Sequence, residues 1–206
     1  MENDLIMSQT AYDFSKKEDA IQTTIIALLA FLVPTFLARI LSGVFGAQSV
    51  IATNSQLIVG SIVNTALVIS AINLKGWKKI LLVVTMPSIS TIASGYIFGP
   101  ISMPMVYMMP AIWLGNFALI FSFKLIMLKM KKNYWISAIV GIMAKVLIIY
   151  GLFCLIKLFG VFPQKAIPTL QKSMSLIQLI TATIGCIIGF GIYKLEGRKS
   201  SINNSK

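Results

Sequence analysis

The stretch SGYIFGPISMPMVYMMPAIWLGN, residues 94–116, interrupts an apolar chain with two glycines and three prolines before it closes on Trp113-Leu114-Gly115-Asn116. Proline removes a backbone N–H donor and breaks or bends a helix. Within a bilayer, backbone groups freed by such a break need a partner from protein, water or a ligand. The stretch therefore predicts membrane helices that open locally beside a cavity, with Asn116 facing it.

The composition of the whole chain places it in a membrane. Of its 206 residues 57% are hydrophobic and only 12% are charged, and the mean hydropathy is +0.85. A water-soluble fold of this length has too little interior to bury so much apolar surface. The lipid bilayer is the expected solvent, with about 20 apolar residues for each spanning helix.

Apolar runs predict an all-α membrane protein with six transmembrane helices. The spans are expected at roughly 20–42, 50–73, 80–98, 104–127, 134–159 and 173–193. Residues 1–19 form an N-terminal tail that holds five of the six acids, and residues 194–206 form a C-terminal tail. The chain is thus expected to be one transmembrane domain, residues 20–193, between two polar tails.

The net charge of +12 follows the alternation of the loops. Thirteen of the eighteen Lys and Arg residues lie in the two tails and near residues 75 and 130, and four lie in the other connections. The positive-inside rule then places both termini in the cytoplasm of a multi-pass protein, which we expect in a prokaryotic plasma membrane. A nucleic-acid interface is not expected, because no soluble face carries the charge.

The chain lacks the residues of several common chemistries. It has no histidine, no Asp or Glu within a predicted span, and no G-x-x-x-x-G-K-[ST] nucleotide loop. These absences argue against a catalytic triad, carboxylate or imidazole metal sites, a bound cofactor and direct use of ATP. A Cu(I) site at Met103, Met105, Met108 and Met109 is the remaining metal interpretation, with packing as the alternative.

One face of the fourth predicted span carries Met109, Trp113 and Asn116 at helical spacing. Pro110 is expected to open the helix locally, and Pro34 and Pro87 are expected to do the same in the first and third spans. The tight link at Gly99-Pro100 predicts an outer hairpin. An interhelical hydrogen bond is an equally good interpretation of Asn116.

The fifth predicted span brings Lys145 near the middle of the bilayer, without an acidic partner in any span. A lone ammonium is costly there unless it is hydrated, paired or able to reach an interface. We favour a role in binding the anionic or polar end of a solute, and a structural lysine is the alternative. The predicted substrate-binding residues are Tyr107, Met109, Trp113, Asn116, Lys145 and Gln178.

The sixth predicted span presents small and polar residues at three- and four-residue spacing, namely Ser175, Gln178, Ala182, Gly185 and Gly189. Such a stripe is typical of close helix contact in membranes. The second span repeats the theme with Asn54, Leu57, Ser61 and Asn64. Residues 160–172 are expected to form a polar connection, either a lid or a turn.

The length, the six spans, the basic cytoplasmic tail and the block MPSISTIASGYIFGPISMPMVYMMPAIWLGN, residues 86–116, resemble the S components of energy-coupling factor transporters. The resemblance implies a subunit that captures a vitamin or another small organic solute from outside. It implies as partners a transmembrane coupling subunit and two ATP-binding-cassette ATPases. The chain itself is then not an enzyme.

S components typically carry an Ala-x-x-x-Ala pattern on the first helix for contact with the coupling subunit. Here the matching positions are Ala20 and Thr24, and Thr23 and Ala27, so threonine replaces one alanine in each pair. Small residues at this spacing still allow close helix approach. A membrane scaffold or assembly protein without a transported solute is the second hypothesis, and an intramembrane enzyme is the third.

Overall fold

The computed structural model describes residues 2–45, 55–95 and 102–203, without the side chains of residues 2–16 and 196–203. Over these ranges the regular structure is entirely helical, which confirms the predicted all-α class. The helices are α1 (Glu2–Phe45), α3 (Ser55–Asn73), α4 (Trp77–Ser94), α5 (Ser102–Met105), α6 (Met109–Ser122), α7 (Tyr134–Leu158), α8 (Ile167–Met174) and α9 (Leu176–Asn203). Short 3-10 turns, η2 (Val106–Met108) and η4 (Gln164–Ala166), and a π-helix, η3 (Phe123–Lys129), join them.

Helix boundaries follow ordinary capping rules where the chain turns. Asn133 caps α7, because its side-chain oxygen accepts a hydrogen bond from the backbone N–H of Trp135 at 2.8 Å. Gly95 ends α4 in the left-handed conformation, with φ of 69°, which glycine adopts without the strain of a side chain. Pro168 lies in the first turn of α8, where its missing N–H costs nothing.

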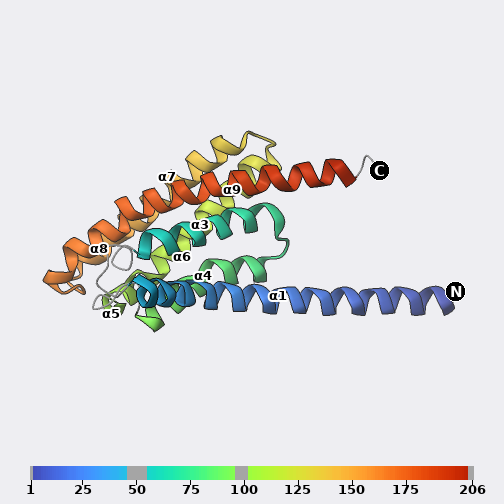
Figure 1. The fold of residues 1–206 in the computed structure, drawn as a ribbon, viewed down its shortest axis with the longest axis horizontal. Helices are drawn as coiled ribbons and strands as arrows, with labels where there is room; N and C mark the ends of the chain where they lie inside the picture. Colours follow the sequence, from blue (N-terminus) through green and yellow to red (C-terminus); the bar gives the residue numbers. More distant parts are fainter. Residues whose placement is uncertain (1, 46–54, 96–101, 204–206) are drawn as a thin grey trace.

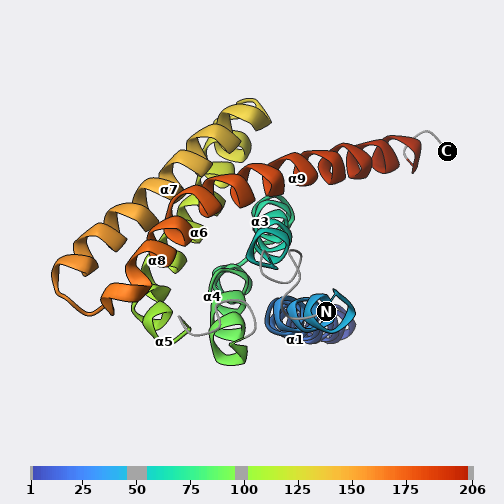
Figure 2. The ribbon, with the colours of Figure 1, turned by 60° about the vertical axis from the view of Figure 1, so that its left-hand side comes forward.

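Three helix pairs organise the molecule: α3 packs along α9, α6 along α7, and α1 along α4. Figure 1 shows the long α1 running along one side of the bundle, and Figure 2 shows α1 next to α4 and away from α7. Two apolar clusters fill the interior. One contains Leu67, Leu119 and Phe123, and the other contains Met105, Met108 and Phe153.

Five helical segments are long and apolar enough to cross a membrane, so the structure is that of a multi-pass membrane protein. They cover Lys17–Phe45, Ser55–Asn73, Ser102–Lys129, Tyr134–Leu158 and Gln164–Leu195. The predicted third span, residues 80–98, coincides with α4, which has 18 residues and is not one of the five. It is polar for a spanning helix, because it carries two lysines and five Ser or Thr residues.

The predicted polar connection at 160–172 is wrong in its secondary structure. Gln164–Met174 is mostly helical, and Leu170 and Met174 of α8 are fully buried. Apolar residues at three- and four-residue spacing, Ile167, Leu170 and Met174, give this short helix one buried face, so α8 packs onto the body rather than forming an open loop.

The helix break predicted at Pro110 is present. The chain passes from α5 through the 3-10 turn η2 into α6, and Pro110 lies at the start of α6. The openings predicted at Pro34 and Pro87 are wrong, because both prolines lie inside the continuous helices α1 and α4, where only one backbone hydrogen bond each is lost. The predicted Gly99-Pro100 hairpin lies outside the described residues, as does Asn54.

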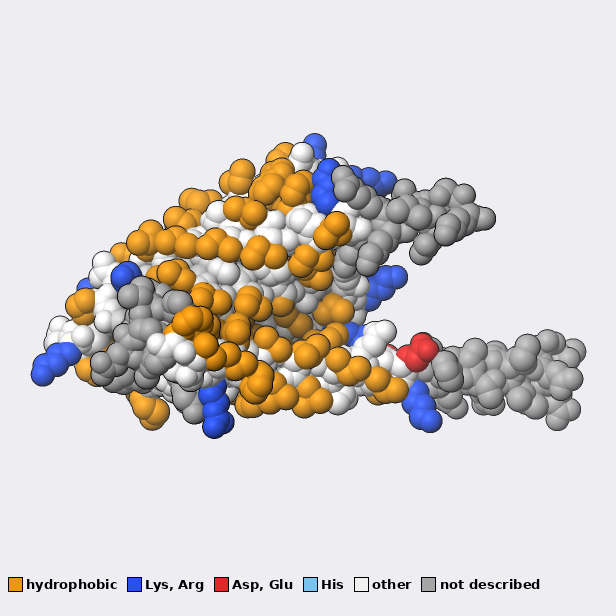
Figure 3. Space-filling view, viewed as in Figure 1, with side chains coloured by type: hydrophobic (Ala, Val, Ile, Leu, Met, Phe, Trp, Pro, Cys, Tyr) orange, Lys and Arg blue, Asp and Glu red, His pale blue; other side chains and the backbone are white. Residues whose placement is uncertain are grey.

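Like-charged connections gather at one end of the molecule. Figure 1 shows both termini, the α3–α4 link and the α6–α7 link at the same end, whereas α5 and α8 lie at the other. Figure 3 shows orange hydrophobic side chains over the flank between the two ends. This arrangement matches the alternation of basic residues along the chain, and we call the end with α5 and α8 the α5/α8 end.

Candidate functional site

Lys145, on the buried face of α7, is the centre of the candidate site. Its side chain is only 2% exposed. The ammonium donates one hydrogen bond to the side-chain oxygen of Asn64 in α3 and another, of 2.7 Å, to that of Asn116 in α6. Three helices thus meet at one charged group in the apolar interior.

The two asparagines are held with their oxygens toward the lysine. The Asn64 amide nitrogen donates to the backbone oxygen of Gly60 at 2.8 Å and to the hydroxyl of Thr181 at 3.2 Å. The Asn116 amide nitrogen donates to the backbone oxygen of Val84 at 3.2 Å. Because lysine only donates hydrogen bonds, this orientation gives it the acceptors that it needs.

Pro87 and the carbonyl that accepts from Asn116 lie in the same turn of α4, which is helical from Trp77 to Ser94. Pro87 has no N–H for the carbonyl of Val83, and the next carbonyl, that of Val84, accepts from the Asn116 amide. The Val84 carbonyl thus joins α4 to the polar cluster. The cluster now joins α3, α4, α6, α7 and α9.

Lys145 has hydrogen-bond acceptors but no carboxylate partner among the described residues. Two amide oxygens are its hydrogen-bond partners in the part of the chain that the structure describes, and an ammonium has three N–H donors. The described carboxylates, Glu18 and Asp19, belong to α1, where Asp19 pairs with Lys79. Neutral oxygens offset part of the desolvation cost of a buried ammonium, but they supply no negative charge.

A cavity opens directly beside this ammonium. Its volume of about 80 Å³ exceeds the roughly 10–15 Å³ that one water molecule needs. Lys145, Asn64 and Asn116 lie in its wall. The other lining residues come from α3, α4, α6 and α9: Gln56, Val59, Gly60, Val63, Pro87, Ser88, Thr91, Ile112, Ile177, Gln178 and Thr181.

The cavity extends from Lys145 toward the α5/α8 end. Gln56 lies in the first turn of α3, and Ile177 and Gln178 lie in the first turn of α9, near α8. The side-chain oxygen of Gln56 accepts a hydrogen bond of 3.1 Å from Ser173 in α8, which leaves its amide group as a donor. The described walls contain no carboxylate and no thiolate. This cavity is suited to an acceptor-rich or anionic ligand.

The structure brings three of the six predicted substrate-binding residues together: Asn116, Lys145 and Gln178 all line the cavity. Trp113 lies one layer behind, where its indole N–H donates to the Ser88 hydroxyl at 2.7 Å. Tyr107 is 54% exposed and packs edge-on against Phe162, and Met109 is half-buried; neither lies in the cavity wall.

Asn64 is marked in the sequence only as part of a polar stripe, yet it binds Lys145 directly. In the sequence, Asn64 stands out because it is an amide within an apolar run. The sequence does not show which helix this side chain faces. Thr181, Ser88 and Gln56 carry no such signal. Ordinary hydroxyl and amide residues stand out only when the helices are placed together.

The methionines of the broken segment lie in different surroundings. Met105 and Met108 are fully buried in an apolar cluster, whereas the Met103 side chain is 76% exposed. Among the described residues no group of three His, Cys, Asp or Glu residues is placed to hold a metal.

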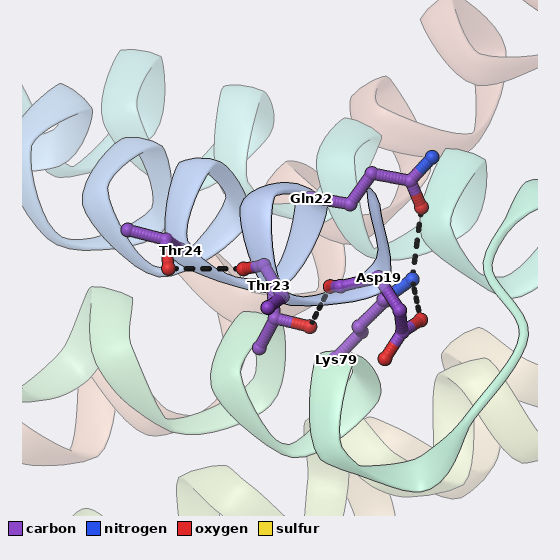
Figure 4. A network of polar contacts seen from close by, with 6 residues as sticks. Asp19, Gln22, Thr23, Thr24 and Lys79 are labelled. Atoms are coloured by element: carbon purple, nitrogen blue, oxygen red, sulfur yellow. Dashed lines mark hydrogen bonds and ion pairs between the residues drawn. The ribbon is translucent and has the colours of Figure 1, made fainter. Parts of the chain in front are cut away.

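The predicted coupling face of α1 lies away from the cavity, and Figure 4 shows it beside α4. Thr23 donates to the backbone oxygen of Asp19 at 2.6 Å and Thr24 to that of Ala20 at 3.0 Å, so both hydroxyls bond within their own helix. Ala20 and Thr24 are exposed, and Thr23 and Ala27 are half-buried. The side chains of this face are small and carry methyl groups, and its two threonine hydroxyls already have hydrogen-bond partners.

The fold and the cavity define a helical multi-pass membrane protein with a buried lysine beside an internal space. Compared with protein-family models, with curated proteins and with solved structures, the chain matches none.

Proposed function

We propose that the chain is the solute-capturing membrane subunit of an ATP-driven uptake transporter, comparable to the S component of an energy-coupling factor system. The cavity beside Lys145 is the observation that carries this proposal. An ammonium with no carboxylate partner among the described residues gains most from a ligand that supplies negative charge, and a spare N–H gives that ligand a hydrogen bond.

The direction of uptake follows from the placement of the cavity. It extends toward the α5/α8 end, and the basic connections and both termini gather at the opposite end. With those basic segments in the cytoplasm of a prokaryotic cell, the cavity opens toward the outside, where a solute is captured.

The energy for uptake comes from other subunits in this proposal, since the sequence contains no nucleotide-binding loop. Helix α1 is suited to hold the coupling subunit. Only 17% of its most apolar 18-residue stretch is buried within the chain. A patch of small side chains lies on it, formed by Ala20, Thr23, Thr24 and Ala27. Small residues at four-residue spacing permit the backbones of two membrane helices to approach closely.

A membrane scaffold is the second candidate, and one observation favours it. The amides of Asn64 and Asn116 use both their ends on protein partners, as residues do that only join helices. This alternative leaves the cavity and the third N–H of Lys145 without a purpose.

Co-purification from native membranes separates the two candidates. The tagged chain, extracted in mild detergent, is expected to retain a transmembrane coupling protein and two ATPases. The double variant Ala20→Phe and Ala27→Phe should release them, because bulky rings prevent close approach of helices. Leu28→Phe, at an exposed position of the same helix, is the control and should retain them. A stable complex that contains no ATPase would refute the transporter assignment.

A further inference from the structure

A second, apolar pocket adjoins the polar cavity. It has a volume of about 210 Å³ and lies between α1, α3 and α4. Its walls are formed by Ile26, Leu29, Ala30, Val33, Pro34, Ile62, Val63, Ala66, Ser70, Val83 and Pro87. Ser70 is the one polar side chain among these described residues, so the pocket is suited to hydrocarbon.

Two residues belong to the walls of both spaces. Val63 and Pro87 line the polar cavity and the apolar pocket. Val63 directly precedes Asn64, which binds Lys145, and Pro87 directly precedes Ser88 of the polar cavity. The two spaces therefore meet across one valine and one proline, neither of which has a polar side-chain atom to satisfy.

Helix α1 is joined to α4 by polar contacts on either side of the apolar pocket, and we call these two groups of contacts the fastenings of α1. At one end Lys79 bonds Asp19 and the side chain of Gln22, the latter at 2.9 Å (Figure 4). At the other end Thr35 donates to the backbone oxygen of Ser90 at 3.1 Å, and the Ser90 hydroxyl donates to the backbone oxygen of Phe31.

The α1 residues of the pocket, from Ile26 to Pro34, lie mostly between these two fastenings and present apolar side chains to it. Apolar side chains separate to admit a hydrocarbon chain without breaking a hydrogen bond. The fastenings keep α1 in place as they do so.

The charge of Lys145 determines which charged group a ligand of this site should carry. Lys145 supplies one positive charge, and no other ionisable side chain lies in either wall as far as the structure describes them. One negative charge balances it. A carboxylate carries a single charge near neutral pH, whereas a phosphate monoester carries about 1.5 to 2 and would be left with an excess in an apolar site.

From these observations we infer that the bound solute is an amphiphilic monocarboxylate. Its carboxylate binds Lys145 in the polar cavity, and its apolar tail passes Val63 and Pro87 into the pocket covered by α1. This inference rests on the proposed role of the Lys145 cavity as the solute site, and it specifies the solute class and the location of the tail.

The test is a chain-length series of acetate, butanoate, hexanoate and octanoate, with the protein in nanodiscs of zwitterionic lipid. Affinity should rise with each methylene group by up to about fourfold, since each buried CH₂ is transferred out of water. Hexylamine should not bind, because its ammonium meets that of Lys145.

Two variants separate the head from the tail. Lys145→Gln should weaken binding of all four acids by one similar factor of about 10 to 100, because the charged partner is lost from each. Ala30→Phe, at a position of α1 that lines the apolar pocket and not the polar cavity, should remove the dependence on chain length and leave the affinity for acetate unchanged. Ile58→Phe, on an exposed position of α3, is the control and should bind as the wild type does.

Equal affinity of the wild type for all four acids, or an unchanged chain-length dependence in Ala30→Phe, would overturn the inference. The proposed transporter role is tested separately by the retained ATPases. If the protein retains its ATPases but binds acetate and octanoate with equal affinity, the proposed function stands and the amphiphilic solute is refuted. If affinity rises along the chain-length series but no ATPase is retained, the amphiphilic solute stands and the transporter role is refuted.

Discussion

At the residue scale, the proposed function makes protein and ligand compete for the ammonium of Lys145. Asn64 and Asn116 give Lys145 two neutral acceptors, which is enough to hold it in place. Neutral acceptors leave the positive charge available to a ligand, whereas a carboxylate would neutralise it permanently. The choice of amides over acids at these two positions is thus the chemical difference between a binding site and an internal ion pair.

Asn116→Asp tests that difference with almost no change in shape. The new carboxylate should pair with Lys145, and anion affinity should fall at least tenfold because the ligand now competes with a fixed negative charge. The lost bond to the Val84 oxygen costs about 1 kcal/mol, which the ion pair offsets, so the protein should stay folded. Isothermal titration and thermal unfolding measure the two effects.

Asn133→Asp is the matched control, since it makes the same substitution at the α7 cap, where aspartate caps as well as asparagine does. Its anion affinity should equal that of the wild type. Undiminished anion binding by Asn116→Asp would show that Lys145 does not contact the ligand.

At the element scale, glycines determine how closely the helices that carry the site approach. A Cβ at Gly185 of α9 would lie 2.5 Å from the Asn64 Cβ and 2.8 Å from the Thr65 nitrogen. The stripe of small residues predicted in the last span therefore packs against α3, as its spacing indicates. The close contact also sets the position of Asn64, so helix packing and the polar cluster depend on each other.

Gly185→Ala should destabilise the protein by about 1–3 kcal/mol, because α9 must move away from α3 to make room for the methyl group. The shift should also weaken anion binding through the displaced Asn64. Gly191→Ala, in the same helix with nothing within 4 Å of the added Cβ, should leave both properties intact or stabilise the helix slightly. Thermal unfolding in detergent compares the pair, and equal stability of the two variants would contradict the packing argument.

Sequence patterns predict the features of single elements better than their partners. Proline and glycine act on their own helix, so the opening before Pro110 and the small-residue stripe of α9 are predictable. The partner of Lys145 is not, because Asn64 lies 81 residues away and its direction depends on how α3 packs against α9. Met109 is predicted at the site because it shares a helical face with Trp113 and Asn116, but it lies where the 3-10 turn meets α6 and is not part of the cavity wall.

At the scale of the whole molecule, the apolar composition and the alternation of basic loops are enough to predict an all-helical, multi-pass membrane protein. Five segments have the length and hydropathy of membrane spans, and α4 is shorter and richer in hydroxyl groups than the rest. The polarity of α4 has a role, because this helix supplies Ser88 and the Val84 carbonyl to the site, and Ser90 to the fastening of α1. A helix that serves a polar interior cannot also be uniformly apolar.

The central claim is that Lys145 holds a small organic anion in the cavity between α3, α6, α7 and α9. Native mass spectrometry of the gently purified protein tests it most directly. The wild type and Lys157→Gln, which changes an exposed lysine of the same helix, should both retain a small molecule. Lys145→Gln should fold and release it. Equal retention by Lys145→Gln, or a wild-type protein that carries no small molecule when isolated from its native membrane, would contradict the claim.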